Sequence, residues 1–181
     1  MPRTSRHPSP GTPTRRRPPG HALLGVYLND HLAGATGGQE LARRVARNHR
    51  GAPAEEALAH LAEEIAEDRA SLLRLMRRLG VRPSRSKVLA ARLAERAGRL
   101  KPNHALVHRS PLSPLLELEG LSLGVHGKLG LWRTLLGVAD PLGLDRSELR
   151  TLQERAERQA AVLEEIRLAG PAPFARADPH R

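Results

Sequence analysis

Residues 55–79 read EEALAHLAEEIAEDRASLLRLMRRL, and this stretch decides the fold class. Its apolar side chains recur every three or four residues, the spacing that places them on one face of an α-helix. The stripe takes in positions 58, 61, 65, 68, 72, 75 and 79, which are Leu, Leu, Ile, Asp, Leu, Leu and Leu. Asp68 is its only polar member. Because a helix with one apolar face buries that face against other elements, the stretch predicts an all-α protein with a packed core.

Further helices are predicted on both sides of this stretch. We expect them at about residues 21–49, 115–138 and 147–168, with a shorter basic helix at about 84–100. Aromatic residues make up only 2% of the chain, whereas strands favour aromatic and β-branched side chains. The composition therefore argues against a sheet.

The connections between these segments predict their arrangement. A turn at residues 51–53 joins the first two long helices, and a turn at 139–143 joins the last two, so each pair should be antiparallel. Residues 80–114 separate the two pairs. The sequence thus predicts a four-helix bundle made of two antiparallel hairpins, joined by a long crossover that contains a short extra helix.

Composition divides the chain into three parts. Residues 1–20 hold six of the 15 prolines and no apolar stripe, so a disordered basic Pro/Arg-rich tail is expected there. Residues 21–168 should form the single helical bundle, since 181 residues suit one domain. Residues 169–181 are expected to be a flexible C-terminal tail.

The net charge of +11 is concentrated toward the N-terminus. The first 20 residues contain no acid and five arginines: Arg3, Arg6, Arg15, Arg16 and Arg17. A mobile basic tail can bind nucleic acid by displacing counterions from phosphate. The other interpretations are that the tail only aids solubility, or that it does not belong to the native protein.

The sequence also predicts the compartment. The chain has no cysteine, which excludes disulfides, thiol catalysis and thiolate metal sites. The apolar run at residues 22–28 is short for a secretory signal, and no run approaches the roughly 18 apolar residues of a membrane span. We expect a cytoplasmic protein with no membrane partner.

Polar residues interrupt the apolar stripes of all four long helices. They are His31, Asp68, Glu119 with His126, and Gln159, and Glu64 lies one turn before Asp68. Burying a charge costs several kcal/mol unless it is paired. Each of the four long helices places at least one polar side chain on the face that should turn toward the core. We therefore predict a network of polar residues inside the bundle.

Two blocks of sequence carry a resemblance. Residues 27–44 read YLNDHLAGATGGQELARR, and residues 110–133 read SPLSPLLELEGLSLGVHGKLGLWR. With the helical layout, they make the chain resemble the ferritin-like superfamily, and most closely a group of uncharacterised bacterial ferritin-like proteins. The resemblance implies a ferritin-like bundle over about residues 21–168 and assigns no activity.

Ferritin relatives with two metal ions take a Glu from each of two helices and Glu-x-x-His from each of the other two. This chain contains no Glu-x-x-His, so a standard di-iron centre is not expected. A different metal site is one interpretation of the core residues. His31, Glu64, Asp68, Glu119 and His126 are the candidate ligands, and they would suit iron, manganese or zinc.

The other interpretation is a structural network without metal. Asp68 would then pair with His31 or with an arginine of a neighbouring helix, and Gln159 would be an interhelical hydrogen-bond partner. In both cases we expect a non-enzymatic, ferritin-like protein. Its apolar surface and the small residues near Gly34 favour a homo-oligomer, and the alternative function is nucleic-acid binding through the basic tail.

Overall fold

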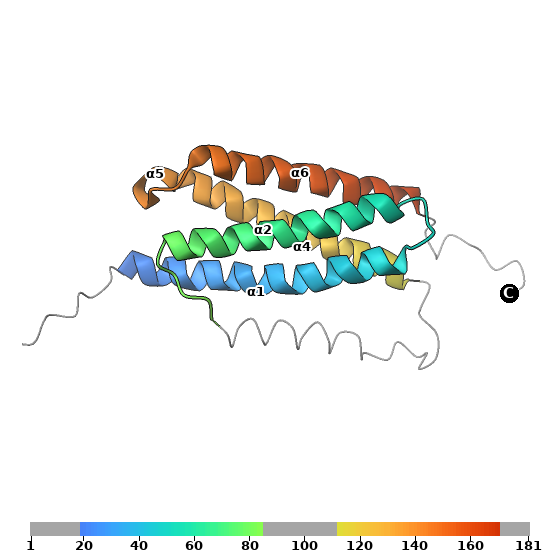
Figure 1. The fold of residues 1–181 in the computed structure, drawn as a ribbon, viewed down its shortest axis with the longest axis horizontal. Coiled ribbons are helices and arrows are strands. Elements are labelled where there is room, and N and C mark those ends of the chain that lie inside the picture. Colours follow the sequence, from blue (N-terminus) through green and yellow to red (C-terminus); the bar gives the residue numbers. More distant parts are fainter. Residues whose placement is uncertain (1–18, 85–111, 171–181) are drawn as a thin grey trace, which may run out of the picture.

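The computed structural model describes residues 19–84 and 112–170, and over these ranges the backbone forms helices and turns without any strand (Figure 1). The all-α prediction is therefore confirmed. The helices are α1 (Pro19–Asn48), α2 (Glu55–Arg78), α4 (Ser113–Gly137), α5 (Ala139–Leu142) and α6 (Arg146–Ala169). The crossover helix predicted at 84–100 lies outside the described residues, as do almost all of both predicted tails.

The helix ends follow ordinary capping chemistry. α2 begins with Glu55 and Glu56, whose charge suits the positive end of the helix dipole, and it ends with Arg77 and Arg78. At the start of α6, the Asp145 carboxylate accepts hydrogen bonds from two backbone N–H groups of the first turn. These signals set the lengths of the two helices.

The four long helices lie side by side, with α1 and α6 running one way and α2 and α4 running the other way (Figure 1). α1 packs along α2, α4 packs along α6, and α4 also packs against α1. α2 and α6 come close at only a few points. None of the described helices combines the length and the apolar character needed to cross a membrane.

The apolar core has two clusters, one toward each end of the helices. One contains Leu72, Trp132 and Leu152, and the other contains Leu61, Leu121 and Leu163. Between the two clusters, Asp68 of α2 and Gln159 of α6 are buried, and Lys128 of α4 contacts both. The candidate functional residues therefore lie in the middle of the bundle, between the two apolar clusters.

Candidate functional site

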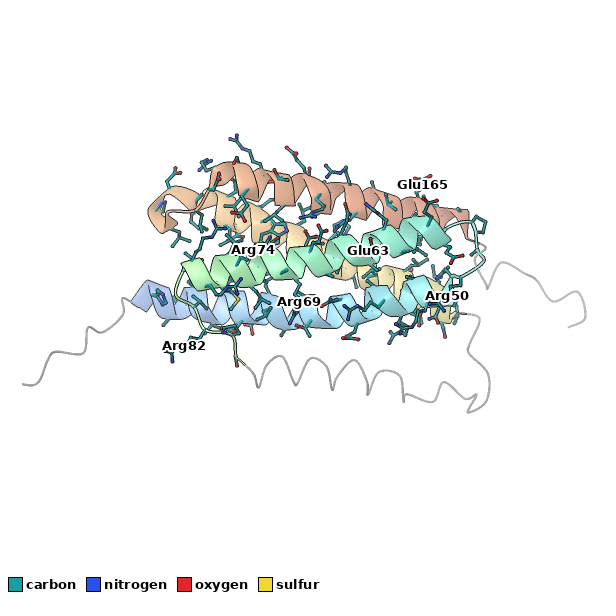
Figure 2. The ribbon with its side chains drawn as sticks, viewed as in Figure 1. Arg50, Glu63, Arg69, Arg74, Arg82 and Glu165 are labelled. Atoms are coloured by element: carbon teal, nitrogen blue, oxygen red, sulfur yellow. The ribbon has the colours of Figure 1, made fainter. Side chains whose placement is uncertain are left out.

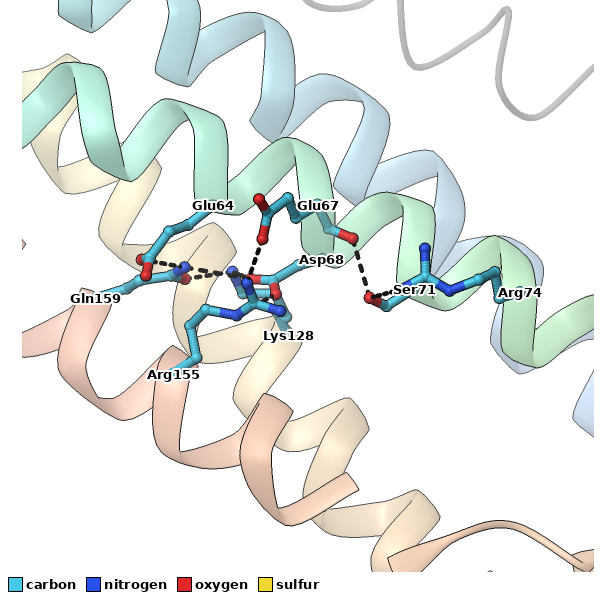
Figure 3. Close-up of polar contacts among 8 residues, drawn as sticks. All are labelled: Glu64, Glu67, Asp68, Ser71, Arg74, Lys128, Arg155 and Gln159. Atoms are coloured by element: carbon cyan, nitrogen blue, oxygen red, sulfur yellow. Dashed lines mark hydrogen bonds and ion pairs between the residues drawn. The ribbon is translucent and has the colours of Figure 1, made fainter. Parts of the chain in front are cut away.

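The central polar residue is Asp68 of α2, whose side chain is 1% exposed. Lys128 of α4 donates from Nζ to Asp68 Oδ2 at 2.5 Å. On the other side, Arg155 Nε of α6 lies 3.0 Å from Asp68 Oδ1, an ion pair outside hydrogen-bonding angles (Figure 3). One buried carboxylate thus holds two cations, each from a different helix.

Gln159 of α6 connects the remaining polar groups (Figure 3). Its Oε1 accepts a hydrogen bond from Lys128 Nζ at 2.5 Å. Its Nε2 donates to Glu64 Oε2 at 2.9 Å and to Asp68 Oδ2 at 3.3 Å. The prediction that Gln159 forms interhelical hydrogen bonds is confirmed, and so is the prediction that Asp68 pairs with an arginine of a neighbouring helix.

Burial lowers the pKa of Lys128 from its ordinary value. The Asp68 carboxylate opposes this change in pKa, whereas the nearby Arg155 cation adds to it. The Arg155 effect follows from charge repulsion, because two positive charges close together disfavour one another, and the Glu64 carboxylate opposes it.

A cavity of about 300 Å³ lies beside this network, between α1, α2 and α4. Its walls are mainly apolar side chains and glycines. The apolar side chains include Ile65, Leu72, Leu121, Val125, Leu131 and Trp132. Gly34 and Gly38 of α1 and Gly124 and Gly127 of α4 supply bare backbone, and a Cβ added at any of these four would meet no atom within 4 Å. The space therefore exists because these positions lack side chains.

Five polar residues also line the cavity: Asp30, His31, Asp68, Arg69 and Lys128. Arg69 donates from Nε to Thr36 Oγ1 at 3.1 Å, across the contact between α2 and α1 (Figure 2). Asp68 and Lys128 bring the charged network to the wall of the cavity. The cavity and the network thus form one continuous site.

His31 is half-buried on the α1 side of the cavity. Its ring packs edge-on against Tyr27, with 4.6 Å between the ring centroids. Burial lowers the pKa of His31, and the nearby Asp30 carboxylate partly opposes that change. The imidazole therefore favours its neutral form.

The five predicted metal ligands do not gather at one point. Asp68 and Glu64 share Gln159, and His31 lines the same cavity as Asp68. Over residues 19–84 and 112–170, no group of three or more His, Asp or Glu side chains is arranged to hold a metal ion. Since Lys128 and Arg155 already face both Asp68 oxygens, the donor set does not fit iron, manganese or zinc.

The third stripe, with its candidate ligands Glu119 and His126, does not face the core. The line of α4 that carries them is exposed throughout, including Leu116 and Leu123, which are 53% and 75% exposed. The buried line is instead 118, 121, 125, 128, 132 and 135, which reads Leu, Leu, Val, Lys, Trp and Leu. α4 carries leucines on both faces, so sequence spacing alone does not distinguish them.

Sequence reasoning missed Lys128 and Arg155, the two cations of the site. Lys128 had a signal, because it is the single charge within a helical apolar line, just as Asp68 is on α2. Arg155 had none, since it stands next to the buried line of α6 rather than on it. The arginines of the predicted nucleic-acid tail lie outside the described residues.

Comparison of the chain with protein-family models, with curated proteins and with solved structures gave no match.

Proposed function

We propose that this protein is a non-enzymatic, ferritin-like four-helix bundle that binds a small apolar molecule in the cavity between α1, α2 and α4. The observation that carries the proposal is the cavity itself, with about 300 Å³ of space and largely apolar walls. An engineered apolar cavity of about 150 Å³ is enough to bind benzene. The space here suits a larger substituted ring or a branched chain.

The charged network supports a binding role rather than a metal-dependent one. Asp68 is paired with Lys128 and Arg155 of its own chain, so its charge needs no ion from outside. Apolar walls with a few placed polar groups are typical of small-molecule sites. The network then supplies the polar end of an otherwise apolar site.

Trp132 provides a direct test, because it is the only tryptophan of the chain and it lines the cavity. Titration of the whole protein with 4-isopropyltoluene should change the fluorescence of Trp132 in a saturable way. The variant Gly124→Leu should abolish that change, because its side chain occupies the space beside Gly124. Absence of a saturable change in the native protein would overturn the proposal.

Gly130→Leu is the matched control, since Gly130 lies on the same helix, is exposed and does not line the cavity. It should bind 4-isopropyltoluene like the native protein. Equal loss of binding in both leucine variants would point to general damage to α4 and would contradict the assignment of the site.

We also propose two partners of the bundle. A second copy of the chain is favoured by the exposed leucines Leu116 and Leu123 of α4, together with Leu112 just before that helix. Nucleic acid is the alternative partner, favoured by the five arginines and the absence of acids in residues 1–20.

A further inference from the structure

Lys128 stands where the apolar cavity meets the charged network. It lines the cavity, its side chain is 13% exposed, and its Nζ is held by Asp68 Oδ2 and Gln159 Oε1, each at 2.5 Å. It is the only lysine among the described residues. A lysine at the edge of an apolar pocket is the usual setting for imine formation with a carbonyl compound.

We infer that Lys128 captures an apolar aldehyde or ketone in the cavity as a protonated Schiff base. The inference rests on the proposed function, because the apolar part of that molecule must first occupy the cavity. It deepens that function by naming the class of ligand. The reaction is a covalent capture and requires no turnover.

The bonds and charges of this step balance. The Lys128 ammonium first gives one proton to solvent, and the nitrogen lone pair then attacks the carbonyl carbon and forms a C–N bond. The electron pair of the C=O π bond moves to oxygen, which takes up a proton. Loss of this oxygen as water gives a C=N bond whose nitrogen carries one proton. Overall, an ammonium and a carbonyl compound give an iminium and water, with no oxidant or reductant.

The network suits both the reactant and the product. The iminium keeps the positive charge of the ammonium, so Asp68 faces a cation before and after the reaction. During the uncharged stage Asp68 still lies 3.0 Å from Arg155 Nε, so it is not left alone in the core. Reactant and product therefore carry the same net charge beside Asp68.

The electrostatics also favour a free amine at this position. Burial lowers the pKa of Lys128, and although Asp68 and Glu64 oppose this change, the pKa remains below its ordinary value. Each unit by which the pKa of a lysine is lowered raises the fraction of free amine about tenfold at neutral pH. Lys128 should therefore react ahead of a lysine in water.

Reductive trapping on the native protein tests the inference. The full chain is incubated at neutral pH with 4-isopropylbenzaldehyde and cyanoborohydride, and the adduct is mapped by peptide mass spectrometry. The sequence offers only two other lysines, Lys87 and Lys101, besides the N-terminal amine. We expect more label on Lys128 than on these three amines together. Label on them with none on Lys128 would overturn the inference.

Competition shows whether the reaction occurs inside the cavity. The probe 4-isopropyltoluene has the shape of the aldehyde but no carbonyl group, so an excess of it should suppress the labelling of Lys128 and leave Lys87 and Lys101 unaffected. Labelling of Lys128 that is indifferent to the competitor would contradict capture in the cavity. This arm uses the native chain and does not depend on the folding of any variant.

Lys128→Arg keeps the positive charge beside Asp68 and removes the reactive amine, so it should lose the mapped adduct, whereas Gly130→Leu should retain it. The two probes also distinguish failure of this inference from failure of the proposed binding function. If 4-isopropyltoluene changes Trp132 fluorescence but the aldehyde leaves Lys128 unlabelled, the cavity binds ligands and the inference fails. If neither probe acts, the proposed function fails as well.

Discussion

Lys128 Nζ on α4 lies 2.5 Å from Asp68 Oδ2 on α2, and this ion pair stands between the two apolar clusters of the core. With Arg155 at the other oxygen of the carboxylate, it joins three helices at one point. Without Asp68, Lys128 would keep Gln159 and Arg155 would keep the exposed Glu67, but neither cation would keep a buried carboxylate.

Asp68→Ala should lower the free energy of unfolding by about 3–5 kcal/mol, because Lys128 and Arg155 would both lose the carboxylate that they share. Urea denaturation of the variant and the native protein measures this difference. Glu63→Ala, on the exposed face of the same helix, should change stability by about 0.5 kcal/mol or less. Equal effects of the two substitutions would contradict a structural role for the network.

Gly124→Ala should raise the free energy of unfolding by up to about 1 kcal/mol, because alanine favours helix and its Cβ meets no atom within 4 Å. Gly143→Ala should do the opposite, since Gly143 has a φ of +63° that suits glycine. The pair can be measured by thermal unfolding under identical conditions. A loss of stability in Gly124→Ala would contradict the presence of open space beside Gly124.

His31 should make stability depend on pH. Its native pKa is lowered from the ordinary value of 6.5, so the unfolded chain binds the proton first as the pH falls. The stability contribution is therefore complete above pH 6.5 and is lost as the pH falls through the native pKa of His31.

Denaturation across a pH series tests this dependence. The free energy of unfolding of the native protein should fall more steeply below pH 6.5 than that of His31→Gln. The slopes of unfolding free energy against pH are compared, because loss of the contact between His31 and Tyr27 lowers stability by the same amount at every pH and leaves the slope unchanged. Parallel curves would contradict the direction of the pKa shift.

The exposed face of α4 should mediate self-association. Replacing Leu116 and Leu123 with Gln should shift the sedimentation coefficient toward that of a monomer, because these exposed leucines would be buried between two copies. Leu23→Gln on α1, where the side chain is 72% exposed, is the control. It removes an exposed leucine from a different helix and should leave the sedimentation coefficient unchanged. A native protein that sediments as a monomer at every concentration would contradict this partner.

The basic tail should account for any binding of nucleic acid. Deletion of residues 1–20 should abolish affinity for duplex DNA, and the native protein should lose affinity with salt at a logarithmic slope of up to about 4.5, given five arginines. Replacing the five arginines with lysine should preserve most of the binding, whereas replacing them with glutamine should not. Unchanged affinity after the deletion would exclude the tail as the binding element.

The sequence predicted α2 well because its pattern is unambiguous. Six of the seven positions in its stripe are buried, Asp68 among them. The partners of Asp68 were not predictable in the same way, since Lys128 and Arg155 come from helices far along the chain, and spacing describes one helix at a time. On α4, leucines on two faces made the exposed line look like a core line.

The cavity was beyond sequence reasoning for a different physical reason. Glycine in a helix can serve a close approach of two backbones or can leave a space between them. At Gly34 and Gly124 the second case holds, with no atom within 4 Å of an added Cβ. Which case applies depends on the distance between helices, and that distance is set by residues elsewhere in the core.

The position of Gln159 also fixes how far α6 can slide along α2. The residues one turn away from Gln159 on α6 are Ala156 and Leu163, both buried and apolar. A slip of one turn, about 5.4 Å, would put one of these apolar side chains in the place of Gln159, so Asp68 and Lys128 would lose the hydrogen bonds that Gln159 makes with them. Because α2 and α6 otherwise come close at only a few points, the axial register of α6 is set by a chemical mismatch rather than by the fit of two apolar surfaces.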